Sequence, residues 1–148
     1  LWPSRSLQHK FAGSIDLLPV LSWMTKLAQI KDVPANYPIG YGLSYLTFKP
    51  TKIGVVPQGY SDGYDRGFSS NSFVLIHGMV CPVIGRIAMN MFVIDVSHLE
   101  GVALEDDVAL IGRQGDQLIT AEMLAERIGT INYEIVARIS PLLPRIVV

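Results

Sequence analysis

Residues 73–96, FVLIHGMVCPVIGRIAMNMFVIDV, decide the fold because they hold three apolar, β-rich runs separated by turn residues. The runs are 73–76, 80–84 and 91–96, and the last has the composition of a buried strand. His77 before Gly78 is more typical of a turn than of a metal ligand. Pro82 cannot donate a backbone hydrogen bond, which favours an edge position or a bulge for the second run. This stretch therefore predicts antiparallel strands.

Short apolar runs separated by Gly and Pro also occur before and after residues 73–96. Further strands are expected at 20–33 (where a helix is the alternative), 43–48, 53–56, 108–111, 134–139 and 145–148. The sequence predicts one helix, at 121–128, because Thr120 can cap its first turn and Gly129 can take a left-handed conformation at its end. We predict an all-β fold, a Greek-key-like β-barrel with one short helix near 121–128.

The composition excludes several classes of protein. The 148 residues fit one domain, and a formal charge of -1 gives no field that would attract nucleic acid, so we expect no nucleic-acid partner. Cys81 is the single cysteine, which leaves no intrachain disulfide and no cysteine cluster for zinc. Apolar runs are far shorter than the ~20 residues of a membrane helix, and no export signal is visible. A cytoplasmic domain without a membrane partner is expected.

The chemistry-bearing residues are ambiguous by pattern alone. Six tyrosines lie in or beside loops, mostly next to glycine: Tyr37, Tyr41, Tyr45, Tyr60, Tyr64 and Tyr133. They could line a pocket, since glycine lets a backbone approach a ligand closely, or they could be aromatics packed over strand ends, which the pattern favours. Asp106-Asp107 is more typical of an exposed acidic turn than of a cation site.

Five short segments, taken in order, resemble the landmarks of the C-terminal domain of the alanine racemase family. They are GYGLSY (40–45), VPQGYSDGYDR (56–66), PVIGRIAMN (82–90), GTINYE (129–134) and LPR (143–145). Their order and spacing agree with the family from about residue 17 to the end of the chain. Three positions depart from the family pattern: Asn90 stands where Asp is usual, Leu43 where Arg is common, and Leu142 where an Arg begins the terminal motif.

The resemblance implies a pyridoxal 5'-phosphate enzyme that interconverts L- and D-alanine for D-alanine supply to the cell wall. Racemisation requires acid/base groups on two faces of the substrate. In the family these are a lysine that carries the cofactor and a tyrosine, which matches Tyr41 here. A free tyrosine has a pKa of about 10, so a basic tyrosine needs cationic or hydrogen-bonding neighbours, which the family supplies from another domain.

The resemblance also assigns other residues. Met89 matches the residue whose backbone N–H holds the substrate carboxylate, Tyr60 a tyrosine at the substrate entrance, and Tyr133 one that bonds the cofactor phosphate. Gly85 and Arg86 match architectural positions. The expected sites are thus Tyr41 for catalysis, Met89 and Tyr60 for the substrate, and Tyr133 for the cofactor, with no metal.

We expect residues 1–19 to be a linker remnant and 20–148 to be the β-barrel domain. The family's cofactor lysine lies in an N-terminal (β/α)₈ barrel, and none of the five lysines here has its sequence context. The chain alone is therefore expected to hold no covalent pyridoxal phosphate and to be inactive. Its expected partners are alanine, that barrel and a second subunit in a homodimer, whose barrel meets this domain. A serine or broad-specificity racemase domain and a non-catalytic β-barrel interaction module are the alternatives.

Overall fold

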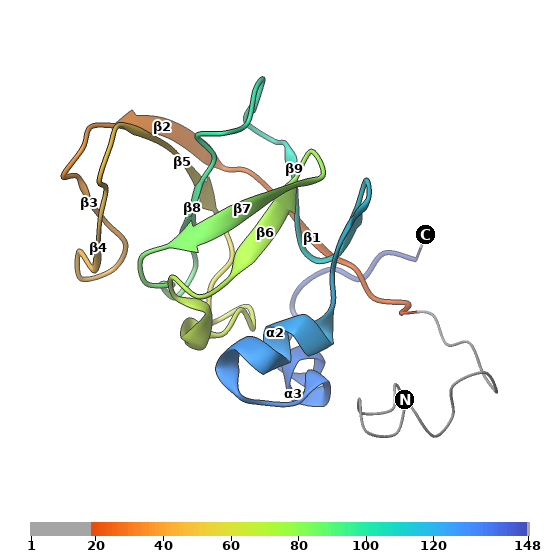
Figure 1. The fold of residues 1–148 in the computed structure, drawn as a ribbon. Coiled ribbons are helices and arrows are strands. Elements are labelled where there is room, and N and C mark those ends of the chain that lie inside the picture. The colour runs from red at the N-terminus through yellow and green to blue at the C-terminus, as the bar shows by residue number, and fades with distance from the viewer. Residues whose placement is uncertain (1–18, 148) are drawn as a thin grey trace.

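The computed structural model in Figure 1 describes residues 19–147 and consists mainly of one curled β-sheet with two short helices at one end. The hydrogen-bonded strand order is β1-β9-β6-β7-β8-β5-β2, with β10 paired to β9. The strands of this sheet are β1 (Trp23–Lys26), β2 (Gln29–Val33), β5 (Thr51–Val56), β6 (Phe73–Ile76), β7 (Met79–Ile84), β8 (Phe92–Asp95), β9 (Asp107–Gln114) and β10 (Gln117–Ile119). The mainly β fold class is confirmed.

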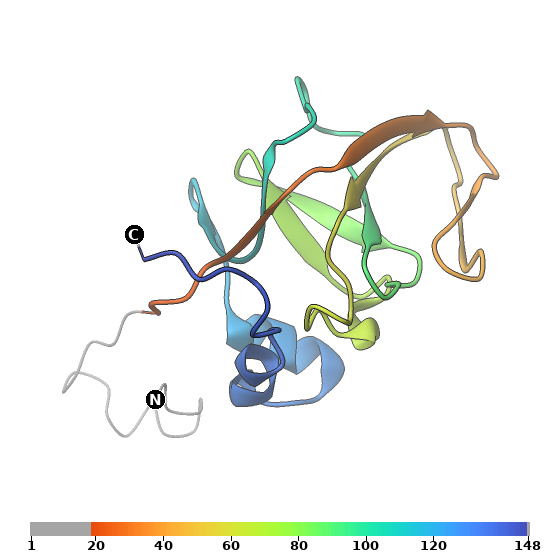
Figure 2. The same ribbon diagram turned by 180° about the vertical axis from the view of Figure 1, so that it is seen from behind.

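The sheet curls because its two outermost strands, β1 and β2, are consecutive in the chain. They are joined through Leu27 and Ala28, whose N–H groups donate to Asp106 O at 2.9 Å and Val55 O at 3.0 Å. Leu27 is fully buried at this junction. The strand expected at 20–33 is therefore two strands with different partners, and Figure 2 shows them bending round the rest of the sheet.

A separate arm projects from this sheet (Figure 1). It consists of β3 (Pro38–Ile39) and β4 (Tyr45–Leu46), which pair only with each other. The strand expected at 43–48 thus shrinks to two residues. Thr47 anchors the arm, because its hydroxyl accepts from the Tyr37 N–H at 2.8 Å and donates to Pro34 O at 2.8 Å.

The edge position expected from Pro82 is wrong. β7 lies between β6 and β8 in the sheet. The chain changes its pairing partner at this proline: residues 79–82 pair with β6, and Val83 and Ile84 pair with β8. Proline lacks a backbone N–H, but at this point the loss costs few of the hydrogen bonds to β6 or to β8. The central strand therefore tolerates Pro82.

Helix α2 (Ala121–Ile128) has the predicted bounds and caps. Thr120 Oγ1 accepts from Met123 N–H, and Gly129 is left-handed with φ of +70°. The strands expected at 134–139 and 145–148 are wrong. The first is α3 (Asn132–Ala137), whose Ile135 is buried, and no strand forms over 145–147, the described part of the second. Neither helix within residues 19–147 is long and apolar enough to cross a membrane.

Candidate functional site

Three of the four predicted site residues line one hollow of about 340 Å³. These are Tyr41, Tyr60 and Met89, which come from three different segments of the chain. The other lining residues are Arg66, Ile87, Ala88, Asn90 and Met91. The hollow therefore brings two phenols, one guanidinium and one amide side chain to a shared surface.

Tyr41 is presented by a tight turn at the end of the β3–β4 arm. Gly40 and Gly42 have φ of +81° and +70°, and the Leu43 N–H donates to Gly40 O at 3.0 Å. A Cβ at Gly40 would lie 2.7 Å from Arg86 N, so only glycine allows this turn to pack on the segment after β7. The Tyr41 side chain is left 70% exposed. The turn thus fixes the backbone and frees the phenol.

The loop at 57–66 holds the segment that contains Met89. Tyr60 N–H donates to Ala88 O at 3.2 Å, and the backbone N–H and hydroxyl of Ser61 donate to Met89 O at 3.0 and 2.7 Å. A Cβ at Gly59 would lie 2.2 Å from Met89 O, so the two backbones touch only because residue 59 is glycine. Met89 N–H has no acceptor among residues 19–147 and is available to a ligand.

Tyr133 lies elsewhere. It is in the first turn of α3, 41% exposed, and lines an apolar groove of about 310 Å³. The groove is formed by residues 19–21, 111–112, 118–122, 132–133 and 136. In Figures 1 and 2, the first described residues lie beside the C-terminal segment and near the helices. Tyr133 therefore belongs to the surface where the chain enters the domain, not to the Tyr41 hollow.

The remaining tyrosines have other environments. Tyr64 is a core residue with no exposed surface and stacks on Phe92 at 4.5 Å between ring centroids. The Tyr37 hydroxyl accepts from Lys31 Nζ at 3.1 Å, and Tyr45 packs edge-on against Phe48 on the arm. Only two of the six tyrosines line the hollow, so glycine neighbours alone did not identify the site.

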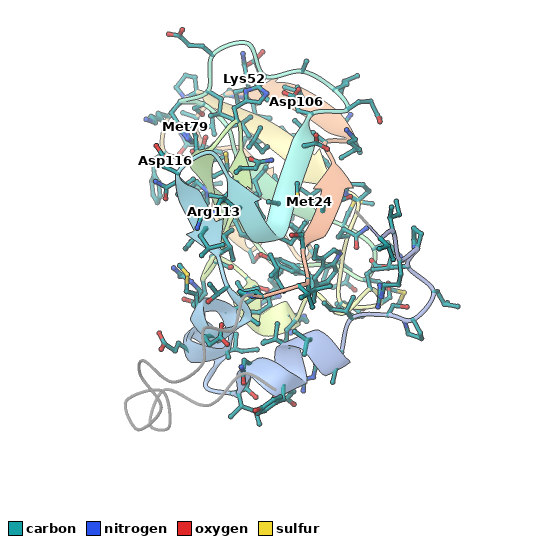
Figure 3. The ribbon with its side chains drawn as sticks, turned by 90° about the vertical axis from the view of Figure 1, so that its right-hand side faces the viewer. Met24, Lys52, Met79, Asp106, Arg113 and Asp116 are labelled. Atoms are coloured by element: carbon teal, nitrogen blue, oxygen red, sulfur yellow. The ribbon has the colours of Figure 1, made fainter. Side chains whose placement is uncertain are left out.

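The acidic pair and the turn histidine form a surface cluster at the end of the sheet away from the helices, where Figure 3 labels Asp106. His77 Nε2 lies 3.0 Å from Asp106 Oδ2, and Lys26 Nζ lies 2.8 Å from Asp107 Oδ1. The Ala103 N–H, and then His77, hold the pKa of Asp106 below its ordinary value. His77 and Gly78 form the turn between β6 and β7, as the sequence predicts.

Sequence reasoning assigned no role to Arg66, which lines the Tyr41 hollow. It follows the 3-10 helix cap Asp65 and begins η1 (Arg66–Phe68). Arg66 ends the segment GYSDGYDR (59–66), but the segment does not show which of its side chains face the hollow. The position of Tyr60 six residues earlier on the same loop is the signal that could have found it.

The comparisons with known proteins agree on one family. A sequence model described as "Alanine racemase, C-terminal domain" matches residues 20–147. Alanine racemases of Leptospira interrogans and Halothermothrix orenii are both 45% identical to the chain, over 100% and 98% of its length. The chain spans only 39% and 37% of those two relatives.

Solved structures give the same result. A Bacillus anthracis alanine racemase with bound L-Ala-P matches 95% of the chain at 40% identity, with a TM-score of 0.87. A Clostridium difficile alanine racemase in complex with cycloserine matches 95% at 36% identity, with a TM-score of 0.85. The chain covers 35% and 36% of those two structures.

Proposed function

Because the chain belongs to the alanine racemase family, whose C-terminal domain it matches over residues 20–147, we propose that it supplies half of a racemase active site. The observation that carries the proposal is that Tyr41, Tyr60 and Met89 line one hollow. The chain corresponds to little more than a third of its relatives, so the whole site needs residues beyond these 148.

In this proposal Tyr41 is the acid/base group for one face of the substrate. Its phenol is 70% exposed at the rim of the hollow, so an amino acid held against this surface can come within reach of it. Met89 N–H donates to the substrate carboxylate, while the Tyr60 N–H holds the Ala88 carbonyl and so fixes the peptide plane that carries the Met89 N–H. Tyr60 borders the same space and limits what can enter it.

Pyridoxal phosphate, when bound, would stabilise negative charge at the substrate Cα. The lining of the Tyr133 groove is poorly suited to a phosphate. Its described lining residues include Tyr133, Thr120 and Asn132 as donors and the Glu122 carboxylate, and none of them is Lys or Arg. The groove therefore fits a phosphate only as a minor contributor through the Tyr133 hydroxyl. We propose that the charge of the phosphate is neutralised by residues outside this chain.

We propose two partners on two surfaces. The Tyr133 groove includes residues 19–21, the first that the structure describes. A barrel domain that precedes this domain in the same protein would therefore contact the domain at this groove. The arm exposes Tyr41, Leu43 and Phe48 by 70%, 70% and 86%, which is typical of an interaction surface. A second subunit covering the arm would receive Tyr41 into its own site, which makes a homodimer. Residues 1–19 would then be the linker and 20–148 the domain.

Tyr41→Phe in the full-length racemase tests the function. The variant keeps the ring and loses the proton-carrying hydroxyl. Wash-in of deuterium at Cα, begun separately from L- and D-alanine, should fall about 100-fold or more from one enantiomer and much less from the other. Tyr37→Phe, on the same arm but outside the hollow, is the control and should keep both rates. Equal losses from both enantiomers after Tyr41→Phe would contradict the assignment.

A serine or broader-specificity racemase is the second candidate. Asn90, which replaces the usual Asp, lines the hollow, and its Nδ2 donates to Ser61 Oγ at 3.2 Å. The amide of Asn90, beside the position proposed for the substrate carboxylate, can hydrogen-bond the hydroxyl of a serine substrate. Comparison of kcat/KM for alanine and serine, in the wild type and in Asn90→Asp, decides: alanine specificity predicts at least a tenfold preference for alanine in the wild type.

A further inference from the structure

The loop that carries Tyr60 contacts the end of helix α3 directly. Asp62 O accepts from Ser140 N–H at 2.9 Å. A Cβ at Gly63 would lie 2.4 Å from Arg138 O, so the two backbones pack without a side chain between them. On its other side the same loop holds Ala88 O and Met89 O. The loop therefore connects the Tyr41 hollow to the helix of Tyr133.

A network of charges reinforces this connection. The Arg138 guanidinium, at the C-terminal cap of α3, uses Nη1 to pair with Asp65 and Nη2 to pair with Glu134 Oε1 at 2.5 Å. Asp65 is also held in place, because its second oxygen accepts from Gly67 N–H at 2.7 Å and caps η1. The other oxygen of Glu134 accepts from the Thr130 hydroxyl. Of the ion pairs within residues 19–147, only Asp65–Arg138 links the loop to the helix.

The Asp65–Arg138 pair lies next to the Tyr41 hollow. Asp65 and Arg138 line a hollow of about 480 Å³ that shares Tyr60 and Arg66 with the Tyr41 hollow. The Asp65 side chain is 25% exposed and that of Arg138 45%, so water weakens their attraction. Neither residue lines the Tyr41 hollow itself, so neither is placed to touch a substrate bound there.

We propose that Asp65 and Arg138 are positioning residues. Their ion pair fixes the loop that bears Tyr60 and holds Met89 relative to the helix that bears Tyr133. One domain then presents its two functional surfaces at a constant spacing, although they face different partners. The inference rests on the proposed function for the roles of these residues, and the ion pair itself is independent of that function.

The test compares two carboxylate-to-amide variants of the full-length protein. Asp65→Asn removes the charge that crosses to α3 but keeps an oxygen to cap η1, whereas Glu134→Gln removes a partner of the same Arg138 within α3. We expect Asp65→Asn to raise KM for alanine about two- to fivefold, with kcat nearly unchanged, because substrate-binding groups become less well placed. Glu134→Gln should leave KM unchanged, and Asp65→Asn combined with Arg138→Gln should be no worse than Asp65→Asn alone.

Amide hydrogen exchange provides a readout that does not need activity. The N–H groups of Tyr60, Ser61 and Ser140 are bonded across the loop contacts, so Asp65→Asn should speed their exchange about two- to fivefold while Glu134→Gln should not. Unchanged exchange, or equal effects of both variants on KM, overturns the inference. Faster exchange in a protein that does not racemise alanine supports the ion-pair inference and counts against the proposed function instead.

Discussion

The thiol of Cys81 lies in the central strand β7 with no exposed surface. Burial, and to a lesser extent the charge of Asp95, raise its pKa to about 12. The thiolate is the nucleophilic form, so we predict that an alkylating reagent leaves the folded protein unmodified near neutral pH. In the unfolded chain the thiol returns to a pKa of about 8.5 and should react.

Iodoacetamide labelling across a urea series, read by mass spectrometry, checks this expectation. The labelled fraction should rise with the same midpoint as the tryptophan fluorescence that reports unfolding. Cys81→Ser, which removes the only thiol, gives the background. Labelling without urea at the rate of the unfolded chain would mean that β7 opens locally, in conflict with its position inside the sheet.

The candidate site could be predicted where its residues lie in short local motifs. Tyr41 and Tyr60 are each fixed by a glycine neighbour, Gly40 and Gly59, whose close contacts no side chain could replace. The Asp65–Arg138 pair could not be predicted in this way, because 73 positions separate its partners. Sequence motifs specify the turn that presents a side chain, and only the fold determines what lies opposite it.

The two helices likewise show which elements local sequence can predict and which depend on the rest of the fold. α2 was predicted with its bounds because its cap, its apolar face and its terminal Gly129 are all local signals. α3 was predicted as a strand because Ile131, at its N-cap, makes no side-chain cap and its sequence is rich in β-formers. Its Asn132 Nδ2 donates to Glu122 Oε1 of α2 at 2.7 Å. Packing on α2 thus overrides the local preference of α3.

The N-cap of α2 gives a prediction at this scale. Thr120 Oγ1 accepts from Met123 N–H at 3.2 Å and satisfies one of the unpaired donors of the first turn. Thr120→Ala should lower the free energy of unfolding by about 0.5–2 kcal/mol. Thr120→Ser keeps the hydroxyl and should lie within a few tenths of a kcal/mol of the wild type. Urea denaturation followed by circular dichroism measures both, and equal losses in the two variants would show that the methyl group, not the cap, carries the effect.

At the scale of the whole molecule, Tyr64 joins separate parts of the fold. It stacks on Phe92 of β8 at 4.5 Å, lies against Phe68 of η1 at 4.9 Å and meets Trp23 of β1 edge-on at 6.0 Å. Its hydroxyl donates to Ser72 Oγ at 3.3 Å inside the core. Ionisation of the Tyr64 phenol would therefore place a charge among the sheet, the loop and the 3-10 helix at once.

Burial raises the pKa of Tyr64 well above its ordinary value of about 10, and the Ser72 hydrogen bond and the Arg127 charge offset only part of the shift. Below pH 10 the phenol is neutral in both states. Above pH 10 the unfolded chain loses this proton while the folded protein keeps it, so the unfolded state gains stability as pH rises. We predict that this group lowers the free energy of unfolding by about 1.4 kcal/mol between about pH 9 and pH 11.

Tyr64→Phe isolates that contribution from every other group that titrates in the same range. At neutral pH the variant leaves the buried Ser72 hydroxyl without this partner, and its stability should fall below that of the wild type by about 1–3 kcal/mol. Between about pH 9 and pH 11 its free energy of unfolding should fall less steeply than that of the wild type, by the same ~1.4 kcal/mol. Urea denaturation of both proteins at the two pH values measures the difference. Parallel pH dependences would mean that the core opens enough at high pH for the folded protein to ionise Tyr64, and that the aromatic cluster does not hold the fold together as a unit.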